Sequence, residues 1–326
     1  MILKNSVLLS CLCIALLFPS PLQAEELSFG AKAPLFGVAL DGYPITRERL
    51  ESVEKDIGIS PRIVVFFLQW PSVDRQDDAP FPRESLEAIW SEGAIPCLTW
   101  EPMYYRAGLE FMVPYQDILN GAYDPYLLEF ARQTALLKKP YIIRFAHEMD
   151  TARYHWGTKA SDYGPESPRI YQEMFRYVVT LFQKTGAHKV LWAFCPNSES
   201  VPNASYDPSA SWNRMEAYYP GHTYVDVLGM DGYNWGTTQT KATSGWDSEW
   251  KAFADIFRPV WEKLRHLAPN KPIIVFETGS VDQGGDKKRW IKNAFDTARE
   301  WKLKGLVWFQ VSKEYDWRIN SRMDVP

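Results

Sequence analysis

The sequence carries little excess charge of either sign and has few cysteines. Its 40 acidic residues nearly balance its 36 basic ones, and the formal charge is -4. A charge this small offers no electrostatic footprint for nucleic acid or for an anionic membrane. Of the four cysteines, only Cys97 and Cys195 lie beyond the first 24 residues, and a chain of 326 residues can bury a core without disulfides. We therefore expect a globular protein with no nucleic-acid partner.

Sequence motifs of several enzyme classes are also missing. No glycine-rich phosphate-binding pattern follows any apolar run, which disfavours an open doubly wound sheet. No Gly-x-Ser-x-Gly turn is present, and none of the five histidines takes part in a His-Glu-x-x-His spacing. These absences disfavour a serine hydrolase and a metal hydrolase. We expect neither a metal nor another cofactor.

A short apolar segment at the N-terminus resembles an export signal. It runs for about twelve residues from Val7 to Phe18, after one lysine, and is followed by the small residue Ala24. A bilayer span needs roughly 20 apolar residues, so this segment is too short to cross comfortably. We expect a cleaved signal peptide over residues 1–24, with an uncleaved anchor as the alternative. The mature chain, residues 25–326, would be secreted or periplasmic and would not remain at the membrane.

Eight short apolar runs bounded by turn residues predict eight strands. Their starts lie roughly 30 to 50 residues apart, which leaves room for a returning helix each time. Helical spacing of apolar residues is clearest after Asp124, after Ser167, which we expect to cap its helix, and after Asp286. Strand and helix thus alternate throughout, and no flexible linker divides the chain. This favours an α/β fold, a single-domain (β/α)8 TIM barrel, over the doubly wound sheet. The eight runs are Leu35–Leu40, Ile63–Leu68, 94–100, 141–147, 190–195, 225–230, 273–277 and 305–310.

The two remaining cysteines end strands that are not neighbours in such a barrel. Cys97 ends the third run and Cys195 the fifth. Strands two apart are separated by roughly twice the ~4.8 Å strand spacing, whereas a disulfide needs Cα atoms within about 7 Å. We expect both residues to remain thiols.

Two glutamates stand at the carboxyl ends of predicted strands, where barrel enzymes carry their chemistry. Glu148 follows the fourth run and Glu277 ends the seventh. Strand alternation puts Arg144, Ala146 and Glu148 on one face, and Val275 and Glu277 on the corresponding face of the seventh strand. Both carboxylates would then point over the barrel mouth. A buried ion pair between Arg144 and Glu148 is the structural alternative.

Two opposed carboxyls are what glycoside hydrolysis requires, since one must be protonated to assist the leaving oxygen and the other ionised to attack. The chain is also rich in aromatic residues, with 14 Trp, 17 Tyr and 17 Phe, and such rings can stack on the apolar faces of sugars. Each ring alone is more often part of a core or loop, so their grouping at strand ends is the signal. Those at or just beyond predicted strand ends are Trp70, Trp100, Tyr104, Tyr105, Trp156, Tyr233, Trp235, Trp246 and Trp308.

Seven segments then carry a resemblance to a known family. They include Ile-Arg-Phe-Ala-His-Glu-Met and Asp-Gly-Tyr-Asn-Trp-Gly, and they cover residues 99–102, 143–149, 219–221, 224–226, 231–236, 277–280 and 316–318. In order and spacing they resemble glycoside hydrolase family 26, whose members include β-mannanases and mixed-linkage β-glucanases. The resemblance implies a retaining barrel enzyme with Glu148 as acid/base and Glu277 as nucleophile. It also implies an active-site histidine at His147, a tyrosine near the nucleophile at Tyr233 and an aromatic floor at Trp308.

The remaining candidate site residues surround these positions. We expect Arg144, His147 and Tyr233 to orient the carboxyls. One departure from the family is Asp150, followed by Thr151, where members usually have Asn and Gly. The extra negative charge would help Glu148 to hold its proton, and it would alter the loop and its contacts to sugar. The residues expected to contact the sugar are Trp100, Glu101, Trp156, Trp235 and Trp308.

The sequence thus predicts a secreted, monomeric, retaining endo-β-glycosidase whose partner is a polysaccharide substrate. We expect β-1,4-mannan first, with β-1,3-1,4-glucan or a bacterial exopolysaccharide as alternatives of the same family. A barrel that binds carbohydrate without turning it over is the alternative of a different class.

Overall fold

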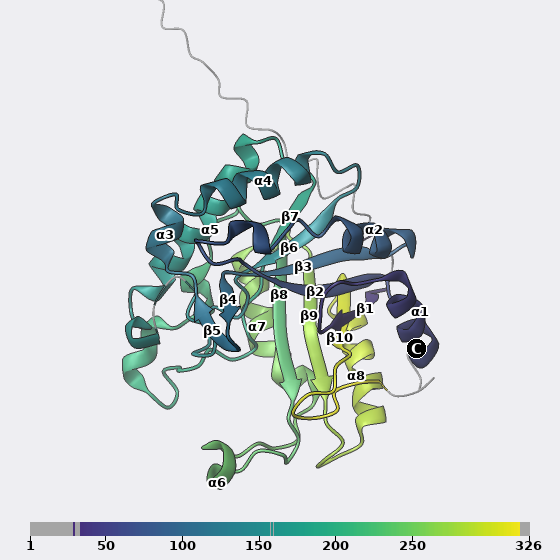
Figure 1. Cartoon of the computed structure of the whole chain (residues 1–326). Coiled ribbons are helices and arrows are strands. Elements are labelled where there is room, and N and C mark those ends of the chain that lie inside the picture. Colours follow the sequence, from purple (N-terminus) through teal and green to yellow (C-terminus); the bar gives the residue numbers. More distant parts are fainter. Residues whose placement is uncertain (1–28, 30–32, 157, 159, 320–326) are drawn as a thin grey trace, which may run out of the picture.

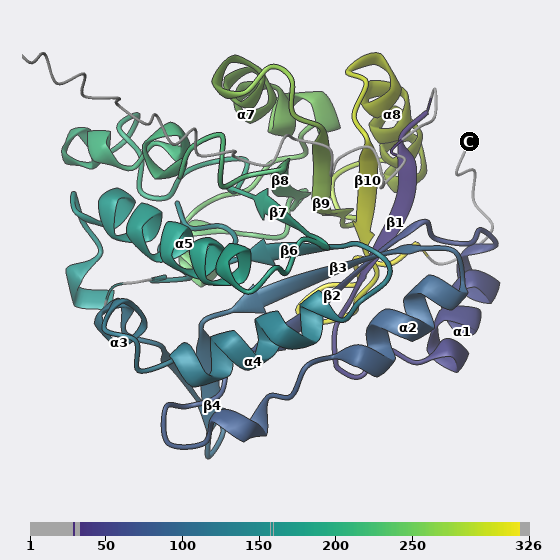
Figure 2. The same ribbon diagram turned by 90° about the horizontal axis from the view of Figure 1, so that it is seen from above.

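The eight predicted strands form a closed parallel barrel, which confirms the predicted TIM-barrel fold. The computed structural model describes Phe29 and residues 33–156, 158 and 160–319, so the predicted signal peptide lies outside the described residues. The order around the barrel is β1-β10-β9-β8-β7-β6-β3-β2, and Figures 1 and 2 show the helices around it. The barrel strands are β1 Leu35–Leu40, β2 Ile63–Gln69, β3 Ile95–Glu101, β6 Tyr141–Phe145, β7 Val190–Phe194, β8 Val227–Asn234, β9 Ile273–Ser280 and β10 Gly305–Phe309.

Six longer helices cover the strands, and each packs against the barrel through apolar residues at helical spacing. In α5, Tyr171, Phe175 and Val178 lie on the buried face. The predicted cap is shifted by one position, because Glu166 is the N-cap and Ser167 is the first helical residue. The six helices are α1 Arg47–Ile57, α2 Arg83–Ser91, α4 Asp124–Ala135, α5 Ser167–Lys184, α7 Phe253–Leu267 and α8 Lys287–Glu300. No helix in this described part of the chain is long and apolar enough to cross a membrane.

The sequence predicted that strand and helix alternate throughout the chain, but one connection in the described structure lacks a helix of this kind. Between β7 and β8 the described chain forms only two short 3₁₀ turns, Pro208–Trp212 and Met215–Tyr218. Prolines at 202, 208 and 220 interrupt this segment, and proline disfavours a continuous helix. An unpredicted hairpin of β4 Met103–Arg106 and β5 Leu109–Met112 follows β3. The short helices α3 Tyr115–Leu119 and α6 Lys241–Ser244 complete the fold, with α6 beyond the carboxyl ends of β8 and β9 (Figure 1).

The core has two parts, which strand alternation separates. Side chains such as Val38, Leu306 and Trp308 pack with the helices in an outer layer. Small and β-branched side chains such as Ala39, Ile63 and Val307 fill the barrel interior. The interior is therefore packed below the mouth, and the polar residues gather at the carboxyl ends of the strands.

Cys97 and Cys195 are both free and buried, as predicted. Cys97 lies on β3 and Cys195 directly follows β7, and β6 separates these two strands. Two thiols should therefore titrate in denaturant without reductant when the chain begins at residue 25. Finding no thiol, together with a mass two hydrogens low, would contradict the strand order.

Candidate active site

Both glutamates reach the barrel mouth through local departures from regular strand geometry. β6 ends at Phe145, and Ala146 and Glu148 then adopt left-handed backbone conformations, with φ of 47° and 50°. Such conformations cost about 1 kcal/mol or more for a residue with a side chain, and neighbouring strands must stabilise them. The backbone N–H of Ala146 donates to Trp100 and that of Glu148 to Cys195, over 3.1 and 2.8 Å. The predicted common face of Arg144, Ala146 and Glu148 is therefore wrong, because strand alternation stops at Phe145.

A β-bulge sets the direction of the second glutamate. Along β9 the register to β8 advances from Val275 to Glu277 while β8 advances by one residue, so Phe276 is the extra residue. Val275 packs in the outer layer with the helices, whereas Phe276 packs in the barrel interior. The predicted shared face of Val275 and Glu277 is thus also wrong. A bulge re-aims a side chain, and here it lets Glu277 follow Phe276 toward the barrel axis.

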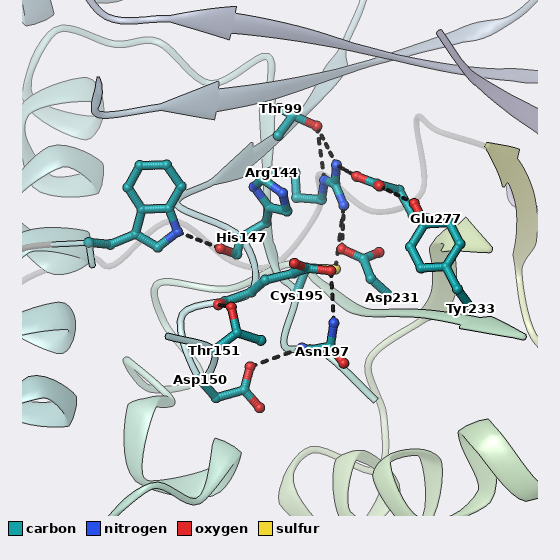
Figure 3. A network of polar contacts seen from close by, with 12 residues as sticks. Thr99, Arg144, His147, Asp150, Thr151, Cys195, Asn197, Asp231, Tyr233 and Glu277 are labelled. Carbon is teal, nitrogen blue, oxygen red and sulfur yellow. Dashed lines mark hydrogen bonds and ion pairs between the residues drawn. The ribbon is translucent and has the colours of Figure 1, made fainter. Parts of the chain in front are cut away.

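Arg144 connects the residues at the centre of the mouth (Figure 3). Its Nε and Nη2 donate to the Thr99 hydroxyl over 2.9 and 2.7 Å, and Nη1 donates to Oδ2 of Asp231 over 2.6 Å. Nη2 also donates to Oε1 of Glu277 in a close ion pair. The structural alternative of an Arg144–Glu148 pair is therefore not what forms. Burial opposes the charge on Arg144, but the carboxylates of Asp231 and Glu277 raise the pKa of its guanidinium, so it stays charged.

Glu277 has a second donor, and a neutral histidine lies nearby. The Tyr233 hydroxyl donates to Oε2 of Glu277 over 2.6 Å, so each carboxylate oxygen accepts a hydrogen bond. These two donors fix the orientation of the Glu277 carboxyl. Burial, with the positive charges of Arg144 and Arg153, lowers the pKa of His147 well below its ordinary value. The imidazole is therefore neutral, and its Nδ1 has no hydrogen-bond partner in the described part of the chain.

His147, Asp231 and Glu277 also bring three possible metal-ligand atoms within 4.8 Å of one another. The Arg144 guanidinium donates to both carboxylates in this cluster. Its positive charge therefore already neutralises the two carboxylates that would otherwise coordinate a metal ion. A bound cation would have to displace Arg144, and the donor set fits an arginine better than a metal.

Glu148 lies in a different environment from Glu277. It is half-buried, and its Oε1 accepts a hydrogen bond of 2.9 Å from the side-chain amide of Asn197. Burial and the negative charge of Glu277 raise the pKa of Glu148 to about 8, against partial lowering by Arg144 and Asn197. Glu148 therefore carries a proton at neutral pH. The two carboxyls differ as an acid and a nucleophile must.

A third carboxyl, Glu101, lies at the end of β3. It is buried, and its Oε2 accepts a hydrogen bond of 2.5 Å from the amide of Gln69. Burial raises the pKa of Glu101 to about 7. The carboxyl is therefore partly protonated at neutral pH, and it can accept or donate a hydrogen bond at this edge of the mouth.

Two of the tryptophans expected to contact sugar lie in the outer core instead. Trp100 has no exposed surface and stacks on Phe130 at 4.4 Å between ring centroids. Trp308 is likewise fully buried and packs edge-on against Trp290 of α8. Both side chains point toward the helices because they lie on the outward face of β3 and β10. The predicted sugar contacts of Trp100 and the aromatic floor at Trp308 are therefore wrong.

Other aromatic residues pack around Tyr233 near the site. Trp317, from the segment after β10, is buried and lies 4.9 Å from Tyr233 and 5.0 Å from Trp235 between ring centroids, so it supports these two rings. Trp235 is half-buried, so part of its ring is accessible. Trp156 is buried and donates its indole N–H to the carbonyl of His147, so it supports the acid/base loop from behind. Trp246, near α6, and Tyr105, on the hairpin, are among the exposed aromatic residues.

Several residues of the site had no role in the sequence interpretation. These are Gln69, Thr99, Asn197, Asp231 and Trp317. Asp231 opens one of the resembling segments and Trp317 lies in another, so a closer reading of polar and aromatic residues in those segments could have found both. Asn197 follows an apolar run by two residues, which is the position where polar residues of barrel enzymes gather. Thr99 opens another of those segments, but it lies inside an apolar run, and its residue type alone indicated no role.

An eight-stranded parallel barrel with two unequal carboxyls at the carboxyl ends of its strands is the arrangement of a barrel glycosidase. The family model of glycosyl hydrolase family 26 matches residues 118–274. The chain belongs to glycosyl hydrolase family 26.

Two relatives show how far the similarity extends. Endoglucanase H of Acetivibrio thermocellus is 34% identical over 282 residues, which is 86% of this chain and 28% of that protein. A mannan endo-1,4-β-mannosidase of Bacillus subtilis is 26% identical over 186 residues, which is 51% of this chain and 46% of that protein. The chain thus spans less than half the length of either relative.

Solved structures share the fold. The Bacillus subtilis mannanase BCman matches with a TM-score of 0.62 and 18% identity, covering 92% of this chain and 86% of that one. A family 26 β-mannanase from Bacteroides ovatus matches with a TM-score of 0.57 and 20% identity, covering 89% and 82%. At these identities the likeness supports the barrel alone.

Proposed function

We propose that this chain is a retaining endo-β-glycosidase that hydrolyses a β-linked polysaccharide. The observation that carries the proposal is the contrast between two carboxyls at one barrel mouth. Glu277 accepts hydrogen bonds from Arg144 and Tyr233 at its two oxygens, which hold the carboxyl in a fixed orientation. Glu148 has a raised pKa of about 8, which keeps it protonated at neutral pH.

The two roles follow from these environments. Glu277 attacks the anomeric carbon while Glu148 gives its proton to the departing glycosidic oxygen, so a covalent glycosyl-enzyme forms and the leaving sugar departs as an alcohol. Glu148 is then ionised and takes a proton from water, which attacks the same carbon and releases Glu277. Arg144 and Tyr233 hold the nucleophile in place, and Arg144 stays charged through both steps because Asp231 shares it.

Two backbones have support as substrate. Mannan is supported by relatives named mannan endo-1,4-β-mannosidase, which match about half of this chain. A β-glucan is supported by the relative named Endoglucanase H, whose match is longer and more identical. Mannose and glucose differ at the 2-hydroxyl, and contacts to this group strengthen in the transition state, so one polymer should be preferred strongly.

The substrate proposal is tested by kcat/KM on soluble galactomannan, barley-type mixed-linkage glucan, xylan and bacterial exopolysaccharides, read as new reducing ends. We expect one of the first two to exceed the other by more than tenfold. Glu277→Ala on the same panel is the control for contaminating activity. Binding without hydrolysis of every polymer would contradict the proposal and would favour the carbohydrate-binding alternative.

We also propose that the chain is exported and acts as a monomer without a metal or other cofactor. A polysaccharide supplied from outside the cell does not cross a membrane unaided, so an endo-acting enzyme that degrades it acts outside the cytoplasm. The predicted signal peptide over residues 1–24 supports export.

A further inference from the structure

Asp150 is a buried carboxyl that the two catalytic steps do not use. It lies in the loop after β6 and has no exposed surface, so it has no direct contact with a sugar. Its Oδ1 accepts a hydrogen bond of 3.0 Å from the backbone N–H of Asn197, and its Oδ2 accepts one of 2.9 Å from the Ser200 hydroxyl. Both partners belong to the loop that follows β7. The Asp150 carboxylate therefore links the loop after β6 to the loop after β7 by hydrogen bonds.

Asn197 carries this connection to the acid/base residue. Its side-chain oxygen accepts the backbone N–H of Glu199 over 3.1 Å, which fixes the orientation of the amide. The amide nitrogen must then face the other way, and it donates to Oε1 of Glu148 over 2.9 Å. The path from Asp150 to Glu148 is thus two hydrogen bonds long and runs through a single residue.

The backbone of Asp150 reinforces the same junction. Its carbonyl accepts hydrogen bonds from Val201 N–H over 2.8 Å and from the Asn213 amide over 3.0 Å. Asn197 also forms a bridge with Asp231, the partner of Arg144. Displacement of Asp150 would therefore release the loop that carries Asn197.

We propose that Asp150 is a positioning residue that fixes the Glu148 carboxyl through Asn197, and that its negative charge adds to the charges around that carboxyl. This inference rests on the proposed function in that Glu148 is taken as the acid.

Other charged and titratable groups face the pair. Glu148 faces Glu277, which raises its pKa more than Asp150 does, and Arg144, which lowers it. Asp150 has a pKa raised to about 6 by burial, so it is ionised over most of the neutral range, and Lys263 of α7 lowers that pKa in part. The remaining groups around the pair are Asp231, Tyr154 and Tyr233 near Glu148, and Tyr163, Tyr171 and Tyr218 near Asp150.

Asp150 and Asn197 shift the pKa of Glu148 in opposite directions, so substitutions at the two positions should have opposite effects. The charge of Asp150 raises the pKa of Glu148, whereas the hydrogen bond from Asn197 lowers it. Asp150→Asn keeps the shape and can keep both hydrogen bonds, because its oxygen accepts from Asn197 and its amide donates to Ser200. Asn197→Ala removes the hydrogen bond to Glu148 and keeps the charge.

The experiment measures the pH profile of kcat/KM on the preferred soluble polymer. The alkaline limb reports loss of the proton from Glu148. Asp150→Asn should move this limb to lower pH by roughly half a unit, and Asn197→Ala should move it to higher pH and also lower kcat. The control is Asp226→Asn. Asp226 directly precedes β8, and its largely buried carboxyl accepts a hydrogen bond from the backbone N–H of Trp192 in β7. This substitution should leave the alkaline limb unchanged.

A second readout does not depend on turnover. Carbon-13 NMR of labelled glutamate carboxyls gives the titration of Glu148 directly, with its signal assigned by its loss in Glu148→Gln. A shift toward lower pH in Asp150→Asn supports the inference even if no polymer is hydrolysed, in which case only the proposed function fails. If Asp150→Asn does not fold, the upward shift in Asn197→Ala still tests the connection.

Two outcomes would overturn the inference. One is an Asp150→Asn titration that matches that of Asp226→Asn. The other is a shift of the same sign in Asp150→Asn and Asn197→Ala, because a merely structural role would disturb the site in both variants alike.

Discussion

Glu277→Ala should lose activity on polysaccharide by on the order of 10⁴-fold or more, and azide should restore turnover. Removal of the carboxylate leaves a space beside Arg144 and Tyr233, both of which donate to it in the native protein. Azide can occupy that space and attack the anomeric carbon from the same side, with Glu148 still present to protonate the leaving oxygen. The product should be the α-glycosyl azide, the inverted configuration.

Glu148→Ala should fail in a different way. Hydrolysis of natural polymer should fall about 10² to 10⁴-fold, the usual contribution of a general acid. A dinitrophenyl glycoside needs no protonation to leave, so its glycosylation step should be spared. Glu173→Ala, which removes a glutamate of α5 that pairs with Arg169 at the surface, is a matched control and should behave as the wild type. Wild-type turnover of polymer by either active-site variant would refute the role of that residue.

Arg144→Met should lower the free energy of unfolding by about 3 to 5 kcal/mol. The substitution leaves Asp231 and Glu277 buried beside each other without their shared counter-ion. Burial already raises the pKa of Asp231 in the native protein, and Arg144 opposes this rise, so removal of the guanidinium should raise that pKa further above its value in the unfolded chain. The loss of stability should therefore be largest at pH 8 and should shrink as the pH falls and Asp231 becomes protonated.

Urea unfolding at pH 8 and pH 5 measures this effect. Arg169→Met is the control, because the ion pairs of Arg169 with Glu166 and Glu173 are exposed and contribute little. Equal stability of the two variants would contradict the central place of Arg144 in the site. A loss that did not depend on pH would show that packing, and not charge, is what Arg144 supplies.

The sequence predicted the barrel well because its strands are buried on both faces. A parallel barrel strand must be apolar along its whole length, and all eight such runs became strands. Glu148 and Glu277 stood out for the same reason, since a carboxylate directly after an apolar run is costly unless it has a partner or a role. The hairpin β4 and β5 was missed because its alternating, partly exposed residues do not form an apolar run.

The directions of side chains at the strand ends could not be predicted in the same way. Alternation assumes regular strands, but Ala146 and Glu148 leave the strand conformation and Phe276 forms a bulge. None of these three residue types is associated with such geometry, so only the tertiary contacts impose it. The same limit explains Trp100 and Trp308, which the expectation of sugar contact placed at the mouth although their strand positions face the helices.

The measurement that tests the account most directly is the configuration of the first product. Retaining enzymes hold their carboxyls about 5 to 5.5 Å apart and pass through two inversions at the anomeric carbon. Proton NMR of a soluble oligosaccharide during the first minutes of hydrolysis should therefore show the β-anomer, with the α-anomer appearing later by mutarotation. An α-anomer formed first would mean that water attacks directly, and Glu277 would not be the nucleophile.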